Sequence, residues 1–376
     1  MKRRQFLGQL GKGALLSGAG LAAGCKPAEQ ASQTGVAPAA ATFKPVKWKM
    51  VTTWPKNFPG LGTGANYLAE LITRMSGGRI EVKVYGAGEL VPAFEVFDAV
   101  RQGTAQLGHG SAYYWKGKSE AAQFFSAVPF GLAAAEMNAW LYHGGGMELW
   151  QETYAPFGLM PMAAGNTGVQ MAGWFNREIN SLEDLQGLKM RIPGLGGEVL
   201  ARAGGVPVNL PGGELFTALQ SGAIDATEWV GPYNDLAFGF YKAAKYYYYP
   251  GWHEPGTTLE CMVNQAALTA LPQELQDIVL NAARVANQNM LTEYIARNNQ
   301  ALQTLLNEHH VDMRPLPDAV LSRLQQLSDE VVAEVAAKDA LSQRVNDSFQ
   351  AFRKQVTAWH DISERAYLNA RAVNSI

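Results

Sequence analysis

Apolar positions in the first part of the chain alternate between two local patterns. Short β-rich runs predict strands over residues 47–54 and 79–85, and apolar residues three or four positions apart predict helices over residues 63–75 and 93–102. Glycine follows each helix, where the chain has to reverse into the next strand. Alternating strands and helices of this kind predict an α/β lobe.

A second series of the same kind follows a helical middle. Its weak internal match to the first series, residues 214–222 against residues 95–103, keeps Glu, Phe, Ala and Gly in one register, although any two glycine-capped helices share much of this pattern. Two α/β lobes are therefore predicted, with the ligand site between them at the carboxyl ends of their strands. The predicted elements are helices over 182–187, 197–203 and 214–221 and strands over 189–192, 206–210 and 224–230.

The rest of the chain is almost wholly helical. Residues 271–310 predict one very long helix or a broken pair, and residues 311–315 predict a short strand. Beyond these, large apolar residues three and four positions apart form one helical stripe. This stripe either braces its own molecule or forms a dimer contact, and the pattern alone favours neither. Its members are Phe349, Phe352, Val356, Trp359 and Ile362.

The N-terminus predicts export. A charged start with Arg3 and Arg4 precedes an apolar stretch over residues 13–24, which is typical of a signal peptide and resembles a twin-arginine signal, with an ordinary signal as the alternative. Cys25 follows a lipoprotein-like cleavage sequence, and a cut after Ala39 competes with it. Residues 26–44 are polar and rich in Ala and Pro, so they predict a linker rather than part of a core. The protein is expected in the periplasm.

Charge and cysteine content limit which partners and which disulfides the exported chain can have. The formal net charge of the whole chain is −2, and removal of a signal rich in Lys and Arg makes the exported chain more acidic. Nucleic acid is therefore excluded as a partner, and an anionic ligand needs a local cationic anchor. The two cysteines, Cys25 and Cys261, are not expected to form a disulfide, because the first is removed or lipidated. No stretch after the signal is long and apolar enough to cross a membrane.

Arg191 is the strongest candidate for that anchor. It lies in a predicted central strand, and a guanidinium can bind a carboxylate through two parallel hydrogen bonds. An internal ion pair to Glu or Asp is the alternative. The histidines show no spacing typical of a zinc site or a catalytic triad, so an enzyme is not expected.

Further polar residues fall near the ends of the second-lobe strands. Gln170 lies in the run that Asn166 opens, and Glu228 and Trp229 close the strand predicted over 224–230. Carboxylate, amide and carbonyl oxygens suit a hard cation, and a cation would let Glu228 approach an anionic ligand. Tyr113 follows a first-lobe strand and is expected on the opposite wall of the cleft.

Four stretches resemble the solute-binding proteins of tripartite ATP-independent periplasmic (TRAP) transporters, namely residues 76–90, 99–108, 187–193 and 219–225. The resemblance covers essentially the whole chain after the signal. It implies a two-lobed periplasmic binding protein-like fold with a hinge and a long C-terminal helical extension. It also implies delivery of a small carboxylate to TRAP membrane permease subunits.

The resemblance also assigns roles to residues. It is closest to the branch that binds 2-oxo acids such as pyruvate, in which the arginine at the place of Arg191 binds the ligand carboxylate. In that branch a cation, usually sodium with calcium as an alternative, bridges ligand and protein. The metal ligands implied here are Gln170, Glu228, the Trp229 backbone and Glu260. Asn166, Gln170, Trp229, Tyr113 and Arg191 are the substrate-binding residues expected.

The same branch implies a homodimer through the C-terminal helix. Function is thus predicted as extracytoplasmic solute binding without catalysis, and the alternative is an exported metal-assisted hydrolase with an acidic substrate. The expected organisation is an export signal and linker over residues 1–42, lobe 1 mainly over 43–165, lobe 2 mainly over 166–256, a crossing segment and long helix over 257–318, and a helical extension over 319–376.

Overall fold

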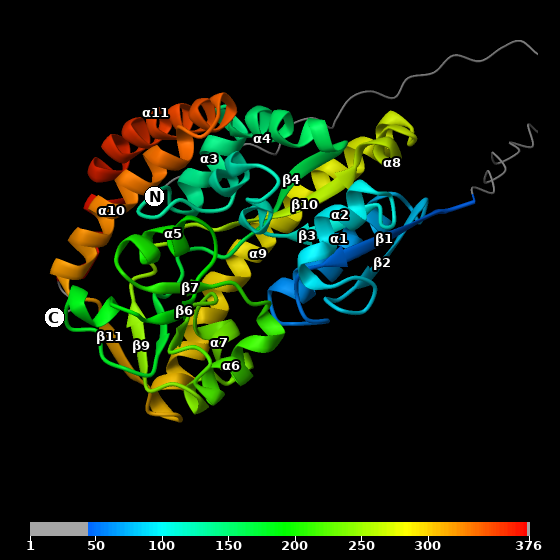
Figure 1. Ribbon diagram of the computed structural model, residues 1–376. Helices are drawn as coiled ribbons and strands as arrows, with labels where there is room; N and C mark the ends of the chain where they lie inside the picture. Colours follow the sequence, from blue (N-terminus) through cyan, green and yellow to red (C-terminus); the bar gives the residue numbers. More distant parts are fainter. Residues whose placement is uncertain (1–43, 374–376) are drawn as a thin grey trace, which may run out of the picture. The chain divides into compact units, whose positions relative to one another are not determined.

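The computed structural model describes residues 44–373. The predicted export signal, the linker and Cys25 lie outside the described residues, so they remain predictions. The described chain forms two mixed sheets with helices around them, which confirms the two-lobed α/β fold (Figure 1). Over residues 44–373, no helix combines the length and the hydropathy that a membrane span requires.

The first sheet is five-stranded and draws on distant parts of the chain. The first three strands run parallel, and β10 runs antiparallel to both of its neighbours. β10 thus returns the chain to this sheet after β5 to β9 of the second sheet, and β11 later rejoins the second sheet, so the two sheets are joined by more than one crossing. The order is β2 (Ile80–Tyr85), β1 (Val46–Thr52), β3 (Leu107–Gly110), β10 (Thr258–Asn264) and β4 (Leu159–Asn166).

The second sheet is six-stranded, and its central strands carry the candidate site. β6 runs parallel to β7 and β8, while β5 runs antiparallel to β8 and β9. A run of four tyrosines forms β9, with Tyr247 and Tyr248 buried. The order is β11 (Asp312–Pro315), β9 (Tyr246–Tyr249), β5 (Gly173–Phe175), β8 (Ala226–Thr227), β6 (Lys189–Arg191) and β7 (Val206–Val208).

One long helix, α9 (Gln273–Asn307), contacts elements of both sheets. It packs against β4 and against α1 (Leu61–Met75) beside the first sheet, and against α7 (Pro232–Phe238) beside the second (Figure 1). Its 35 residues contain neither Gly nor Pro, so nothing interrupts the backbone hydrogen bonds. Of the two predicted forms, a single helix is therefore confirmed.

The C-terminal arm consists of α10 (Asp318–Ala336), α11 (Ala340–Ile362) and α12 (Glu364–Ala372). α10 packs on α5 (Gly194–Arg202), whereas α11 packs on α3 (Ala134–His143) and α4 (Gly146–Tyr154). The arm therefore contacts helices that flank both sheets.

The predicted apolar stripe divides along α11. Phe349 is fully buried with its ring 5.1 Å from that of Trp140, and Phe352 and Val356 pack beside it. Farther along, the stripe is exposed, with Trp359 62% and Ile362 74% accessible. The first half of the stripe braces its own molecule, and the second half is uncovered.

Leu305→Ala on α9 is expected to lower the free energy of unfolding by about 2–5 kcal/mol, because the side chain is fully buried and its removal leaves a cavity. Ile295→Ala on the same helix is the matched control, because Ile295 is 66% exposed, and it should change the value by less than about 0.5 kcal/mol. Urea unfolding followed by circular dichroism measures both. Equal losses in the two variants would contradict the packing described for α9.

Candidate functional site

Two parallel strands of the second sheet end side by side at the candidate site. β6 ends at Arg191, and β8 ends at Thr227, earlier than the strand predicted over 224–230. The Glu228 N–H donates to the Arg191 carbonyl at 3.2 Å, so both side chains leave the same edge of the sheet. Glu228, Trp229 and Val230 therefore lie beyond the carboxyl end of β8, which is where open α/β sheets hold ligands.

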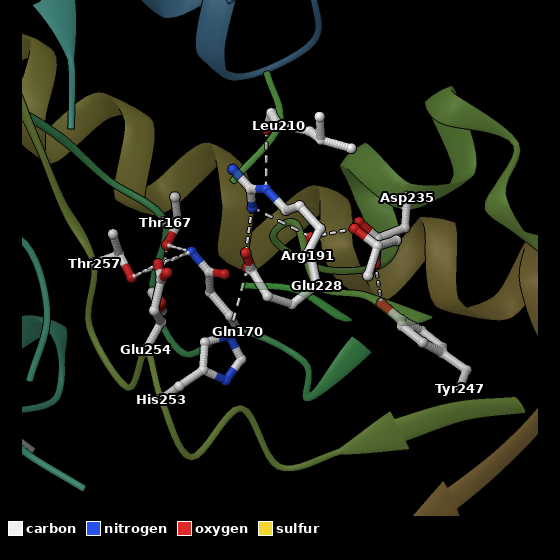
Figure 2. A network of polar contacts seen from close by, with 12 residues as sticks. Thr167, Gln170, Arg191, Leu210, Glu228, Asp235, Tyr247, His253, Glu254 and Thr257 are labelled. Atoms are coloured by element: carbon white, nitrogen blue, oxygen red, sulfur yellow. Dashed lines mark hydrogen bonds and ion pairs between the residues drawn. The ribbon is translucent and has the colours of Figure 1, made fainter. Parts of the chain in front are cut away.

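The guanidinium of Arg191 is buried and almost fully occupied by hydrogen bonds. It forms an ion pair with the Glu228 carboxylate and donates to the Leu210 carbonyl at 3.2 Å (Figure 2). It also donates to the Tyr114 hydroxyl at 3.2 Å and lies 5.0 Å from the Trp229 ring centre. Burial lowers the pKa of Arg191, but the neighbouring acidic groups, led by Glu228, together outweigh burial and raise it, so the guanidinium stays charged. The internal ion pair foreseen as the alternative for Arg191 is thus present.

A buried carboxylate ties α7 to the second sheet. Asp235 accepts hydrogen bonds from the Trp174 indole at 3.0 Å and from the Tyr247 hydroxyl at 2.7 Å. Burial raises the pKa of Asp235 to about 7. These contacts hold α7 against β5 and β9.

Gln170 reaches the site from the loop after β4. Its amide nitrogen donates to Thr167 at 3.1 Å, to Glu254 at 2.8 Å and to Thr257 at 3.2 Å (Figure 2). Its backbone N–H donates to the Glu254 carbonyl at 3.1 Å. The loop over residues 250–257 thereby holds both the backbone and the side chain of Gln170.

Several buried polar atoms at the site have no hydrogen-bond partner among the described residues. They include Gln170 Oε1, Glu228 Oε2, Trp229 Nε1 and both ring nitrogens of His253. Unpaired buried polar atoms cost about 1–3 kcal/mol each in a folded protein, so a group of them indicates a bound partner. The donor set of carboxylate and amide oxygens fits a hard cation.

The structure adds two residues to this group that the sequence reasoning did not assign. Glu228, His253 and Glu254 each present a ligand atom, and these atoms lie within 4.8 Å of one another. His253 Nε2 is 3.4 Å from Glu228 Oε2. Burial, followed by the Glu228 charge, raises the pKa of Glu254. Both residues lie on a loop without periodicity, so only their position in Gly-Trp-His-Glu hinted at the site.

Two further predicted site residues make local contacts in the structure. Glu260 on β10 pairs with the Trp115 indole, and burial raises its pKa to about 7. It is not part of the group formed by Glu228, His253 and Glu254. Asn166 shapes the loop before Gln170, because it accepts from the Gly168 N–H at 2.8 Å.

The tyrosines at the end of β3 form one wall of the site. Tyr113 and Tyr114 line a small cavity together with Gln170 and Trp229, and its free space of about 10 Å³ is that of roughly one water molecule. A second cavity of about 300 Å³ adjoins it at the same two tyrosines. Burial raises the pKa of both phenols, so each keeps its hydroxyl proton. A solute larger than water enters only when these walls move apart.

Trp54 contacts the second-lobe side of the cavity from the end of β1. Its ring lies 6.1 Å from that of Trp229, edge to face, and its indole N–H donates to His109 Nδ1 at 2.8 Å. Burial lowers the pKa of His109 to about 4. The neutral imidazole therefore orients Trp54 against Trp229.

This gives a pH prediction for His109→Gln, in which the amide oxygen replaces Nδ1 as acceptor. Between pH 6.5 and 4 the unfolded chain protonates His109 and the folded chain does not, so His109 lowers the free energy of unfolding as the pH falls. The wild-type value minus the variant value should therefore decrease by about 3 kcal/mol across this window. Buried carboxyl groups titrate in both proteins and cancel in the difference.

Urea unfolding at a series of pH values measures this difference. A difference that stays constant, or that grows as the pH falls, would contradict the neutral buried state of His109.

The chain is similar to known proteins over most of its length. Residues 50–339 match the family model described as bacterial extracellular solute-binding protein, family 7. The chain is 44% identical over 369 residues to the monocarboxylate 2-oxoacid-binding periplasmic protein of Nostoc sp. (strain PCC 7120), and the match covers 98% of each chain.

Two crystal structures of TRAP periplasmic solute-binding proteins are similar throughout. The protein from Colwellia psychrerythraea, with bound calcium and pyruvate, is 45% identical with a TM-score of 0.84, covering 87% of this chain and 100% of that one. The protein from Pseudoalteromonas atlantica T6c, with bound sodium and pyruvate, is also 45% identical with a TM-score of 0.84, covering 87% and 99%.

Proposed function

Since the chain belongs to family 7 of the bacterial extracellular solute-binding proteins, the receptors of TRAP transporters, we propose that it captures a small 2-oxo monocarboxylate such as pyruvate together with a cation. The observation that carries this proposal is the buried Arg191 beside a group of unpaired buried oxygens. The family consists of receptors that work with a membrane permease. The exported hydrolase considered from the sequence is therefore not supported.

Arg191 is the proposed anchor for the solute carboxylate. Its four hydrogen bonds leave one of the five guanidinium N–H groups for a further acceptor. A carboxylate oxygen of the solute can accept from this N–H, and burial strengthens such charge-assisted bonds. The Tyr114 hydroxyl accepts from Arg191, so its own proton is free to point at a solute oxygen.

The cation is assigned to the oxygens that lack partners. Gln170 Oε1 and Glu228 Oε2, with the Trp229 carbonyl as the sequence resemblance implies, are the proposed ligands. A bound sodium or calcium ion supplies positive charge between Glu228 and the solute, which would otherwise repel each other. Glu260, implied as a ligand by the resemblance, is left out of this set because it lies against Trp115.

Capture also requires movement of the cavity walls. Tyr113, Tyr114 and Trp54 come from the first-sheet side, whereas Arg191 and Trp229 come from the second. A solute that contacts both sides favours the closed arrangement by its differential affinity for it. The permease then distinguishes a loaded receptor from an empty one by its shape.

Two finer assignments complete the proposal. Family 7 receptors of this kind are expected in the periplasm, and we assign export to the twin-arginine-like segment at Arg3 and Arg4, with Cys25 as a candidate lipid anchor.

We also propose a homodimer through the C-terminal arm. Its support is the uncovered half of the α11 stripe, which continues into exposed Tyr367 and Leu368 on α12.

Arg191→Ala is expected to weaken pyruvate binding by at least about 30-fold, because a buried charge-assisted contact is worth about 2 kcal/mol or more. Isothermal titration with pyruvate, in sodium and in calcium buffers, measures the loss. Arg202→Ala is the control, since this arginine lies on the same side but pairs with Glu334 at the surface. Recovery of unchanged pyruvate afterwards tests for the absence of turnover.

Arg191→Ala leaves the Glu228 charge buried without its partner, which destabilises the protein. The double variant Arg191→Met with Glu228→Gln removes both charges, so its pyruvate binding can be compared with that of the wild type in a folded protein. Pyruvate binding that persists in both variants would refute the assignment of Arg191. Consumption of pyruvate by the wild-type protein would refute the receptor function.

Sedimentation velocity is expected to give a dimer for the wild-type protein and a monomer for Trp359→Glu with Ile362→Glu, because two charges cannot be buried in an apolar contact. Ile295→Glu, a change at an equally exposed position on α9, should leave the dimer intact. Pyruvate affinity should stay unchanged in both variants. A monomeric wild-type protein at high concentration would exclude the proposed contact.

A further inference from the structure

One loop of the first-sheet side packs directly on residues of the second-sheet side. Residues 53–60 join β1 to α1, and Phe58 in this loop is 8% exposed. Its ring stacks on that of Phe238 at the end of α7, with the ring centres 4.2 Å apart and the planes inclined by 28°. It also meets the Trp229 ring edge to face at 6.4 Å. Phe58 thus joins the loop to the segment beyond β8.

A buried hydrogen bond holds the same loop against α7. The side-chain nitrogen of Asn234, a residue that is inaccessible to solvent, donates to the Pro59 carbonyl at 2.9 Å. The side-chain oxygen of Asn234 accepts from the Tyr294 hydroxyl of α9 at 2.8 Å. The next residue, Gly60, turns the chain at a φ of 70°, and a Cβ there would lie 2.6 Å from the Tyr294 hydroxyl oxygen. The loop therefore meets α7 and α9 in one defined position.

Phe58 lies beside the solute cavity without lining it. Trp54 and Trp229 are walls of the cavity, whereas Phe58 touches Trp229 and is not among the residues that line the space. Trp54 belongs to the same loop as Phe58. When the walls move apart to admit or release a solute, the loop therefore separates from Trp229 and α7. Opening returns the Phe58 and Phe238 rings to water, which costs free energy, and it breaks the hydrogen bond to the Pro59 carbonyl.

We propose that Phe58 is a positioning residue for solute capture, and that the clasp formed by Phe58, Pro59, Asn234 and Phe238 sets how long the loaded receptor stays closed. The clasp acts through the relative position of Trp54 and Trp229 and makes no contact with the solute itself. This inference rests on the proposed function, because it requires a solute to be held between the two sides. It goes beyond that function by naming residues outside the site that determine the lifetime of the complex.

The test compares Phe58→Ala with the wild-type protein by stopped-flow tryptophan fluorescence, over a series of pyruvate concentrations in one buffer that contains sodium and calcium chloride. The dissociation rate should rise by about 10–100-fold, which corresponds to the loss of one buried phenylalanine side chain. The association rate should change by less than about threefold, because the solute binds to the open form, in which the clasp is not made.

Phe238→Ala tests the clasp from its other side. This ring is only half-buried, so the variant also decides the question where Phe58→Ala does not fold. It should raise the dissociation rate as well. In the double variant the combined effect should be smaller than the product of the two single effects, because both substitutions remove the same contact.

Phe157→Ala is the matched control, because that ring packs on Phe97 within the first-sheet side, with the ring centres 5.1 Å apart. It should lower the free energy of unfolding but leave both rates unchanged. Dissociation as slow as in the wild type in Phe58→Ala and Phe238→Ala, or equally fast in Phe157→Ala, would overturn the inference and leave the proposed function intact. A wild-type protein that does not bind pyruvate would instead overturn the proposed function and this inference with it.

Discussion

The buried ion pair between Arg191 and Glu228 is the interaction on which the site depends. Both side chains are almost inaccessible to solvent, at 1% and 0%. Two charges are removed from water at a cost of several kcal/mol each, and their attraction offsets that cost only when the remaining hydrogen-bonding groups are satisfied. Contacts to Leu210 and Tyr114 satisfy all but one of the remaining N–H groups of Arg191, but Glu228 Oε2 is left without a hydrogen bond among the described residues. The pair is therefore incomplete on its acidic side.

That asymmetry links the fold to the proposed function. The pairing of β6 with β8 places Arg191 opposite Thr227, so Glu228 follows at the edge of the sheet, where the strands end. The first-sheet side supplies neutral groups, chiefly tyrosines and Trp54, which exclude water without adding charge. A cation and an anionic solute would complete the charge balance between the two sides. Binding and closure are then one event, since the contacts that hold the solute also bring the sides together.

The sequence predicted those parts of the molecule whose pattern is local. For the segment that forms α9, the sequence pattern allowed either one continuous helix or two shorter ones. The structure shows one helix, and the segment contains no Gly or Pro that would break it. Arg191 and Glu228 were found because they lie at the ends of recognisable strands. The end of β8 was misplaced because Trp229 and Val230 continue the β-rich pattern, although the chain leaves the sheet after Thr227.

The remaining site residues depend on tertiary contacts that no local pattern records. His253 and Glu254 lie on an irregular loop, and hydrogen bonds to Asn166, Thr167 and Gln170 bring that loop to the site. Glu260 followed from resemblance, but in the structure its carboxylate pairs with the Trp115 indole. The apolar stripe of α11 likewise keeps the same spacing along its whole length, so the sequence could not show that only its first half packs against other helices.

The most direct test of the central claim is a crystal structure of the protein grown with pyruvate and calcium chloride. The account predicts a carboxylate of the solute within hydrogen-bond distance of the Arg191 guanidinium, and a cation in contact with Gln170 Oε1 and Glu228 Oε2. Pyruvate bound away from Arg191, or an Arg191–Glu228 pair unchanged with no solute or ion beside it, would contradict the account.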